Sequence, residues 1–370
     1  MGGVNDMTYG MPRAGASGFF QKSWVRWGLI VLLGVVLIVA PLVLPQFANQ
    51  TLIRIGVYAV AVLGLNIVMG YGGQVNLGQI FFLGLGAYVT AYGVANEWNI
   101  VLVLAAAIVI PGVVGLLVSL AAARLGGLAI AMVTIALPIV GVPLAKRFSD
   151  VTGGSQGISA RFSDAPEWTG LYNDQWQFYI VALIAVVAFV LGRNFVRGKF
   201  GRALAIVKEN ESVASSMGIS PYRYKVLAFT VASLFGGASG FLYMVAVQYT
   251  SPETLSFHHS ISLLAAMVIG GAGSIVGSLI GGAYYVFVPQ ATNAIDPNLT
   301  AIIQGVILLV VLFVLPGGLV SLPRRIKRMM RRSGPSAGPT APAPQTTPSS
   351  GPELGAAEEG PQQTERQGQA

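Results

Sequence analysis

The sequence GRALAIVKENESVASSMGISPYR, residues 201–223, is a polar, helix-compatible stretch that stands between two long hydrophobic runs. Its apolar residues recur at helical spacing while Glu209 and Glu211 lie on the other side, so the pattern predicts a short amphipathic helix. Gly218 is a natural end for this helix, and Pro221 would stop any continuation. Two interpretations fit a helix of this kind between membrane spans: it docks a partner protein, or it lies in the lipid headgroup layer.

The composition places the hydrophobic runs in a membrane. Charged residues make up only 10% of the chain and hydrophobic residues 54%. The charged residues are clustered, so long stretches of the sequence contain almost none. A soluble domain carries about 25% charge. Runs of 18 or more apolar residues require a bilayer, and their length and weak period-2 alternation argue against a β-barrel. The sequence therefore predicts an all-α, polytopic transmembrane helix bundle.

We expect about ten spans, joined by turns and loops. The expected spans are about 24–44, 52–69, 80–95, 100–123, 128–145, 176–191, 226–249, 261–276, 277–289 and 299–315. The eighth and ninth are short and are expected to be separated by the glycine-rich break GGAGSIVG, residues 270–277. They could instead form a re-entrant pair, which leaves the span count around 261–289 open. Around the transmembrane domain, residues 23–323, we expect a polar N-terminal segment, 1–22, and a basic juxtamembrane cluster with a disordered Pro/Ser/Gly-rich tail, 324–370.

The basic residues predict the orientation of these spans. With the N-terminus inside, the clusters at 193–225 and 324–332 fall on the cytoplasmic side with Lys22, Arg26 and Arg124. Only Arg54, Lys146, Arg147 and Arg161 fall outside. Both termini are therefore expected in the cytoplasm. The net charge of +8 follows from this asymmetry and does not suggest nucleic acid. The N-terminus lacks an apolar core followed by a small-residue cleavage site, so we expect no cleaved signal peptide.

Glycines gather at two places within the expected spans. The first cluster consists of Gly70, Gly72, Gly73, Gly78, Gly84 and Gly86, and the second of Gly270, Gly271, Gly273, Gly277, Gly281 and Gly282. The clusters end in similar phrases, GAYV and GAYYV. Broken helices at corresponding points in two halves are how many transporters build a midplane site. The alternative is close helix packing through small residues, without any site.

Amide side chains favour a site at the first cluster. Asn66, Gln74, Asn76 and Gln79 place polar groups at membrane depth, where lipid cannot satisfy them, so they should face a cavity or a partner helix. Neutral amides can bind a zwitterion or a polar neutral solute. The predicted substrate pathway therefore consists of Asn66, Gly72, Gly73, Gln74, Asn76, Gly78 and Gln79, joined by Gly270, Gly271 and Gly273.

Other residues argue against an enzyme and against ion coupling. Every Asp and Glu is expected in a loop or a tail, whereas proton- or sodium-driven carriers commonly need an ionisable group at depth, although some coordinate sodium with carbonyls alone. The chain has no G-x-x-x-x-G-K-[ST] phosphate loop and no cysteine. His258 and His259 lack a second ligand pair at metal spacing, so we expect neither a metal nor another cofactor. TGGSQG, residues 152–157, supports no nucleophile–base set and is expected to be a surface turn.

Five stretches resemble the permease subunits of bacterial branched-chain amino acid ABC transporters, most closely the subunit type with TGG in a long external loop. The stretches are GYGGQVNLGQIFFLGLGAYVTA, TGGSQGI, GRALAIVKENESVASSMGISPYRYKVLAFTVAS, SPETLSFHHSISLLAAMVIGGAGSIVGSLIGG and PGGL. They cover most of residues 66–319, and those in the second half are the more specific. The first 22 residues and the tail lie outside the resemblance.

The resemblance implies the transmembrane half of an ATP-driven importer of branched-chain or other hydrophobic amino acids in the bacterial cytoplasmic membrane. Its partners would be separate chains within the lipid bilayer or beside it: a sister permease, two cytoplasmic ATP-binding subunits and an extracytoplasmic solute-binding protein. The chain itself would then not be an enzyme, because its partners hydrolyse the ATP. ATP hydrolysis by these partners would also supply the energy for transport, for which the chain itself shows no source.

The resemblance also marks residues 203–218 as the cytoplasmic coupling helix that an ATPase subunit holds. The implied coupling residues are Ala203, Val207, Glu209, Glu211, Ala214 and Gly218. In the generic importer motif, Glu-Ala-Ala precedes Gly at this place. Here Ser212, Val213 and Ala214 stand before Gly218, so the match is partial.

Three alternatives stay open at this point. Urea and short-chain amide importers use permeases of the same kind, and the amides of the pathway would suit either solute. A self-sufficient secondary carrier or channel would need the glycine breaks to serve ion-coupled gating. A membrane scaffold without transport activity would have no need of polar residues at depth.

Overall fold

The computed structural model describes residues 34–35, 37–124, 127–162, 165–166, 169–293, 300–314 and 317–322. The expected first span, the N-terminal segment 1–22 and the basic cluster and tail at 324–370 lie largely or wholly outside these residues. Within the described part the fold is all-α, as predicted. Strands β1 (Ile158–Ser159) and β2 (Tyr249–Thr250) add one short antiparallel pair, with Ile158 opposite Thr250.

The expected spans are confirmed as helices, with shifted ends. The helices that match expected spans are α2 (Gln46–Leu65), α3 (Gln79–Ala95), α4 (Ile100–Ala122), α5 (Gly127–Arg147), α7 (Asn173–Arg197), α10 (Pro221–Val247), α11 (Phe257–Gly270), α12 (Ile275–Asn293) and α13 (Thr300–Val314). In the described part of the chain, five helices are long and apolar enough to cross a membrane, and three apolar helices are shorter. The fold is therefore that of a polytopic membrane protein, and the count of about ten spans stays a prediction.

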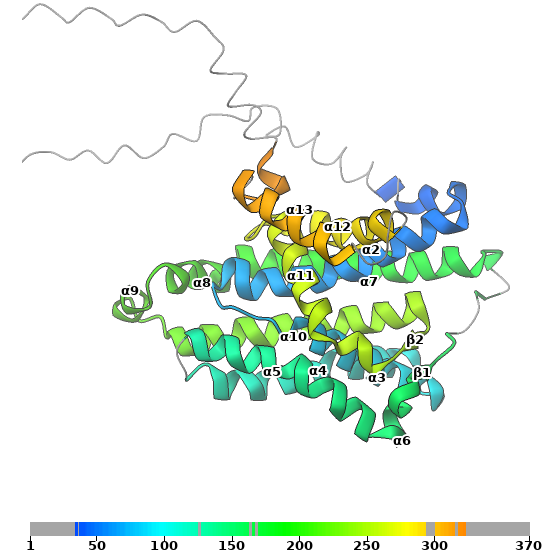
Figure 1. The fold of residues 1–370 in the computed structure, drawn as a ribbon, viewed down its shortest axis with the longest axis horizontal. Coiled ribbons are helices and arrows are strands. Elements are labelled where there is room, and N and C mark those ends of the chain that lie inside the picture. The colour runs from blue at the N-terminus through cyan, green and yellow to red at the C-terminus, as the bar shows by residue number, and fades with distance from the viewer. Residues whose placement is uncertain are drawn as a thin grey trace, which may run out of the picture. The chain divides into compact units, whose positions relative to one another are not determined.

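Helices α2 and α10 form the centre of the described bundle. Within the apolar 18-residue stretch of each helix, 67% is buried in α2 and in α10, against 17% in α7 and 28% in α4 and α5. Helix α10 packs on α2, α3 and α4, while α2 also packs on α7 and α12 (Figure 1). The outer helices thus direct most of their apolar side chains away from the protein, as lipid-facing helices do.

Close helix packing accounts for part of both glycine clusters. A Cβ atom at Gly86 would meet the backbone of Gly237 on α10, and one at Gly282 would meet the backbone of Ala59 on α2. Small residues at such crossings let two backbones approach within the membrane. At these positions the packing alternative holds, whereas the glycines near 70 and 271 lie at breaks between helices.

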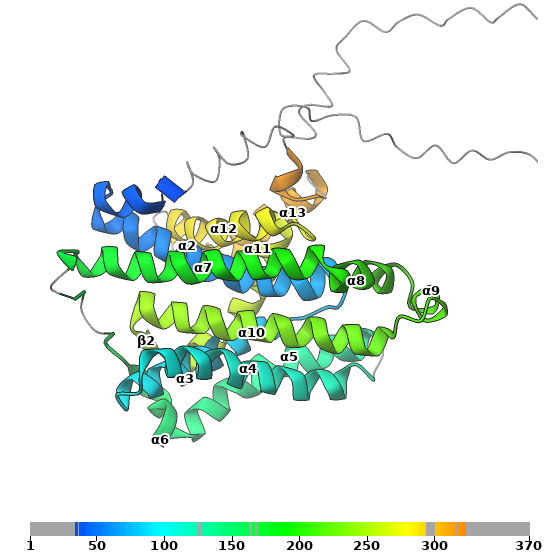
Figure 2. The same cartoon turned by 180° about the vertical axis from the view of Figure 1, so that it is seen from behind.

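The bundle has a basic end and an opposite end. The basic end is defined by Arg124, Arg197, Lys199, Arg223 and Lys225, where α4 and α7 finish and α10 begins. The Tyr222 hydroxyl donates to the Leu120 carbonyl there, which ties α10 to α4. The opposite end holds the β1–β2 pair, α6 (Ser149–Thr152), η2 (Gly154–Gln156) and η4 (Pro252–Leu255). Figure 2 shows α7 and α10 running between these ends, with α8 and α9 beyond the basic end.

One prediction about local structure is wrong. The stretch 203–218 is not one helix but two, α8 (Lys199–Glu209) and α9 (Glu211–Ser216), separated by an extended Asn210. The Asn210 side chain accepts hydrogen bonds from the Ser212 and Val213 N–H groups, and this local cap replaces helical continuation. No helix continues into Pro221 from the preceding segment, as predicted, and Pro221 also begins α10, where its missing N–H costs nothing.

The break in the second half lies within the stretch expected for it. Helix α11 ends at Gly270 and α12 begins at Ile275, so the break is at 271–274, inside the predicted glycine-rich stretch GGAGSIVG, residues 270–277. Gly271 has φ +126°, a backbone conformation that side-chain-bearing residues rarely adopt. The conformation demanded at Gly271 therefore decides where α11 stops.

Candidate functional site

Asn66 joins the two helix breaks although they lie more than 200 positions apart in the sequence. Its fully buried amide donates to the Ser274 carbonyl at 2.8 Å and to the Ser278 hydroxyl at 3.0 Å, and its oxygen accepts from the Gly273 N–H at 2.7 Å. We call this set of contacts the Asn66 network. It satisfies both the donor and the acceptor capacity of the amide, so a polar side chain at this depth is stable.

The backbone around Asn66 departs from a regular α-helix. Residues 66–71 form a π-helical turn, η1 (Asn66–Tyr71), which continues α2. Turns of this type are rare and occur frequently at functional sites. Gly70 lies against the network, where an added Cβ would overlap the Asn66 side-chain oxygen and lie 2.5 Å from the Gly273 nitrogen. Only glycine at position 70 allows the first break to approach the second this closely.

The other predicted pathway amides are also bonded to protein groups. Gln79 donates to the Ala232 carbonyl at 2.9 Å and accepts from Asn76 at 3.3 Å. Asn76 in turn accepts from the Gly78 N–H at 2.9 Å, and Gln74 donates to the Lys225 carbonyl at 3.2 Å. In this conformation the amides therefore hold the first break, residues 70–79, against α10. They are buried, and none of them borders the cavities described below.

The glycines predicted for the pathway divide between the two breaks. Gly72 and Gly78 are buried in the first break, whereas Gly73 is exposed and lies beside the Lys208 stem. In the second half, Gly270 packs against Gly277 and Gly281 of α12. Gly273 belongs to the Asn66 network through its N–H group. The structure thus brings most of the predicted pathway residues into one region near the basic end.

The predicted coupling residues fall into a buried group and an exposed group. Ala203 and Val207 of α8 and Ala214 of α9 are buried against the chain itself, with at most 6% of each exposed. Glu209, Glu211 and Gly218 are exposed. The exposed apolar side chains of this region are Phe200, Val213 and Met217. A partner protein bound to this segment would meet the carboxylates and these apolar side chains. The three apolar residues were not among the predicted coupling residues.

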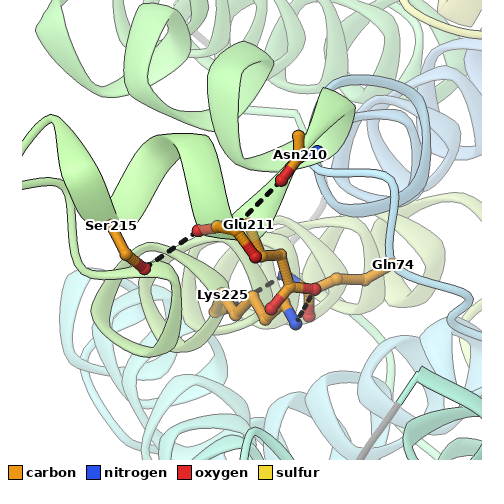
Figure 3. Close-up of polar contacts among 6 residues, drawn as sticks. Gln74, Asn210, Glu211, Ser215 and Lys225 are labelled. Atoms are coloured by element: carbon orange, nitrogen blue, oxygen red, sulfur yellow. Dashed lines mark hydrogen bonds and ion pairs between the residues drawn. The ribbon is translucent and has the colours of Figure 1, made fainter. Parts of the chain in front are cut away.

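Two contacts connect the coupling segment, α8 and α9, to the first break. The Lys208 ammonium on α8 donates to the Gly70 carbonyl at 2.7 Å. On α9, Glu211 forms a 2.5 Å ion pair with Lys225, whose backbone carbonyl is the acceptor for Gln74 (Figure 3). A displacement of either helix would thus act on the break that Asn66 holds in place.

Sequence reasoning missed a cavity near the opposite end. The cavity has a volume of about 410 Å³ and lies between α2, α10, α11, α12 and α13, with Tyr58, Tyr243, His259 and Tyr285 in its wall. A smaller cavity of about 240 Å³ shares these four residues and extends toward η4. Tyrosines inside otherwise aliphatic spans were the signal that could have marked it. Among the described residues, no three His, Asp or Glu side chains gather to hold a metal ion.

An apolar helix bundle with two bonded helix breaks and a polar segment attached to one of them is the architecture of a transmembrane permease. The sequence matches the family described as branched-chain amino acid transport system, permease component, over residues 47–312, and the chain belongs to this family. The resemblance inferred from the sequence is thereby confirmed at the level of the family. Members of the family are permease subunits of ABC importers in the cytoplasmic membrane, so this chain is a multi-pass protein of that membrane.

Individual relatives agree with the family. The high-affinity branched-chain amino acid permease protein LivM of Salmonella typhimurium is 29% identical over 314 residues, which cover 77% of this chain and 72% of the relative. LivM of Escherichia coli is 32% identical over 247 residues, 59% of this chain and 57% of the relative. The ribose import permease RbsC of Escherichia coli is 24% identical over 310 residues, 80% and 95% of the two chains. No solved structure matches this chain.

Proposed function

We propose that this chain forms one transmembrane half of an ATP-driven importer that carries branched-chain or other hydrophobic amino acids into the cell. The family description and the LivM relatives support this class of solute. The complete importer would contain a sister permease, two cytoplasmic ATP-binding subunits and an extracytoplasmic solute-binding protein. This chain would then supply the pathway, and the ATP-binding subunits would supply the chemistry.

The positive-inside rule supports the orientation that this function needs. The basic end carries Arg197, Lys199, Arg223 and Lys225 together with the coupling segment, so it would face the cytoplasm, where ATP is available. The opposite end, with the β1–β2 pair and η4, would face the solute-binding protein. The exposed coupling segment would then project toward the ATP-binding subunits.

The hydrogen bond between Lys208 and the Gly70 carbonyl is the observation that supports the mechanism we infer. When the ATP-binding subunits close, they would displace α8 and α9 through Glu209, Glu211 and the exposed apolar side chains nearby. Lys208 would transmit this displacement to Gly70, and Gly70 lies against the Asn66 network. Separation of the two breaks would expose Gln74, Asn76 and Gln79 to the solute on its way inward.

In this mechanism the Asn66 network is the closed gate on the cytoplasmic side. Its hydrogen bonds are individually modest, about 0.5–1.5 kcal/mol each, so a partner that hydrolyses ATP can break them. Glycines on both sides let the breaks meet and separate without side-chain obstruction. The ion-coupled carrier has less support, because the family description and the LivM relatives are those of transport-system permeases, and the proposed gate is bonded to the proposed coupling segment.

Reconstitution of the complete transporter tests this proposal. The chain, its sister permease and the ATP-binding subunits would be placed in proteoliposomes with the solute-binding protein, and the uptake of labelled leucine, urea and ribose would be measured with and without ATP. We expect uptake of leucine that depends on ATP. ATP-dependent uptake of urea or ribose in place of leucine would keep the importer mechanism and change the assigned substrate. Uptake that follows a proton or sodium gradient without ATP would replace the importer with a carrier.

A further inference from the structure

The lining of the 410 Å³ cavity combines one cationic side chain with an aromatic wall. Arg54 of α2 is exposed and borders the cavity, while no Asp or Glu among the described residues does. The planar guanidinium of arginine matches the geometry of a carboxylate and binds it through paired charge-assisted hydrogen bonds. The charge of this lining therefore favours a ligand with a carboxylate group.

A side chain of the opposite charge borders the adjoining 240 Å³ cavity. Glu253 of η4 borders it, and the two cavities meet at Tyr58, Tyr243, His259 and Tyr285. The Glu253 carboxylate is 71% exposed and lies 3.4 Å from the Lys146 ammonium, an exposed pair of little strength that a ligand ammonium group can replace. A guanidinium and a carboxylate at the borders of two neighbouring cavities, which share these four wall residues, match the two charges of a zwitterion.

Apolar groups between these charges suit an aliphatic side chain. Val57, Val286 and Ala246 line the larger cavity together with the tyrosine rings. The rings of Tyr58 and Tyr285 lie 4.0 Å apart, and His259 bonds the Tyr285 hydroxyl at 3.0 Å, so this wall is held in place by its own contacts. The buried Tyr284 hydroxyl has no hydrogen-bond partner in the described part of the chain and remains available to a ligand.

We propose that this cavity is the site where the permease receives an aliphatic amino-acid zwitterion, with the ligand carboxylate at Arg54 and its side chain against Val57 and Val286. This inference rests on the proposed import function and adds the site and the groups that recognise the solute. A volume of about 410 Å³ lies near the lower limit for ligand sites, roughly 300–1,000 Å³, which favours a single amino acid over a peptide.

The position of the cavity fits a receiving site. Tyr58 precedes Asn66 by eight positions on α2, which corresponds to about 12 Å along the helix axis. The cavity lies toward the end that would face the solute-binding protein, and the Asn66 network lies deeper. A solute released at that end would therefore reach Arg54 and the tyrosines before it reaches the closed gate.

The absence of cysteine from the sequence allows a direct test. In Ala246→Cys the introduced thiol is the only one on this chain and lines the cavity. Tyr172→Cys is the matched control, because Tyr172 lies at the same end, is 75% exposed and borders neither cavity. The complete transporter would be placed in nanodiscs and treated with a hydrophilic thiol reagent, and the labelling rate of this chain would be measured at rising leucine concentrations.

We expect leucine in the millimolar range to slow the labelling of Ala246→Cys at least about 5-fold and to leave Tyr172→Cys unchanged. Leucinamide, which lacks the carboxylate, should protect ~10-fold less well, as expected for the loss of one charge-assisted contact. Equal labelling of Ala246→Cys with and without leucine, in a transporter that imports leucine, would overturn the site and leave the import function standing. A transporter that imports no leucine would refute the function separately.

Arg54→Gln provides a second, independent readout. If Arg54 binds the carboxylate, this variant should lose the difference between leucine and leucinamide as protectants, while Arg54→Lys should keep part of it. Arg147→Gln removes an exposed cation at the same end that borders neither cavity, and it should keep the full difference. An undiminished preference for leucine in Arg54→Gln would contradict the assignment of the carboxylate to this residue.

Discussion

The Lys208 ammonium on α8 donates a 2.7 Å hydrogen bond to the carbonyl oxygen of Gly70, at the C-terminal end of the π-helical turn. A cation is well placed there, because the last carbonyl groups of a helix lack partners within the helix and carry partial negative charge. This bond fastens the polar segment between two spans to the first helix break. It connects the basic end to Gly70, which lies against the Asn66 network.

Lys208→Met should uncouple transport from ATP hydrolysis. Methionine keeps an unbranched side chain beside Gly73 but removes the ammonium that Gly70 accepts. We expect leucine uptake to fall ~10-fold, equivalent to about 1.4 kcal/mol, while the ATPase activity of the complex stays within about twofold. Arg202→Met, which removes an exposed cation from the same helix, is the matched control and should transport normally. Normal uptake by Lys208→Met would refute the role of this bond.

Gly70→Ala should destabilise the folded protein. The added methyl group would overlap the Asn66 side-chain oxygen and press on the Gly273 backbone, so the breaks could not meet as they do. Overpacking of this kind costs about 1–3 kcal/mol. We expect a lower unfolding temperature in detergent. Gly305→Ala on α13 is the control, because nothing lies within 4 Å of its added Cβ. Equal unfolding temperatures for the two variants would argue against a close approach at Gly70.

Asn66→Leu and Ser278→Ala should show coupled effects on stability. Leucine has the same number and branching of side-chain heavy atoms as asparagine, but it leaves the Gly273 N–H and the Ser274 carbonyl without the partner they have now. A buried unpaired group costs about 1–3 kcal/mol. Because Ser278 bonds the same amide, the double variant should lose at least about 0.5 kcal/mol less than the sum of the two single losses. Strict additivity in thermal or denaturant unfolding would contradict the network.

Charge reversal at Glu211 should be repaired by reversal at Lys225. The pair is partly exposed, with 57% of the Glu211 side chain accessible, so its contribution to stability should be at most about 1 kcal/mol. Its effect should appear in coupling: we expect Glu211→Lys to reduce ATP-dependent uptake, and Glu211→Lys with Lys225→Glu to recover most of it. Failure of the double reversal to recover any uptake would show that Glu211 acts on a partner subunit and not through Lys225.

Glu209 offers a contrast, because it has no ion pair among the described residues and is exposed on α8. Glu209→Lys should therefore act only on the partner. We expect the ATP-binding subunits to co-purify less well with this variant and uptake to fall, with an unchanged unfolding temperature. Full transport by the variant with both Glu209→Lys and Glu211→Lys would contradict the proposal that this segment couples transport to ATP hydrolysis.

Local sequence patterns predicted the helices and the two glycine-rich breaks, but they did not predict the break at Asn210. Long apolar runs specify spans because each residue adds apolar surface regardless of what packs beside it. The break at Asn210 was missed because an amide that caps the following helix competes with helical continuation, and hydrophobic periodicity does not register that competition. The break at Gly271 lies within the predicted stretch, residues 270–277, but its exact ends depend on the packing of α11 against α12.

The sequence by itself determined that this protein is an all-α membrane permease of the branched-chain amino acid transport family, since hydrophobic length and motif content are properties of single segments. Only the tertiary structure decided that Asn66 bonds the second break, that Lys208 reaches Gly70, and that Arg54 and four tyrosines border one cavity. These contacts join segments separated by more than 100 positions. A periodic pattern shows which face of a helix is buried, but the partner on that face depends on how all the helices pack together.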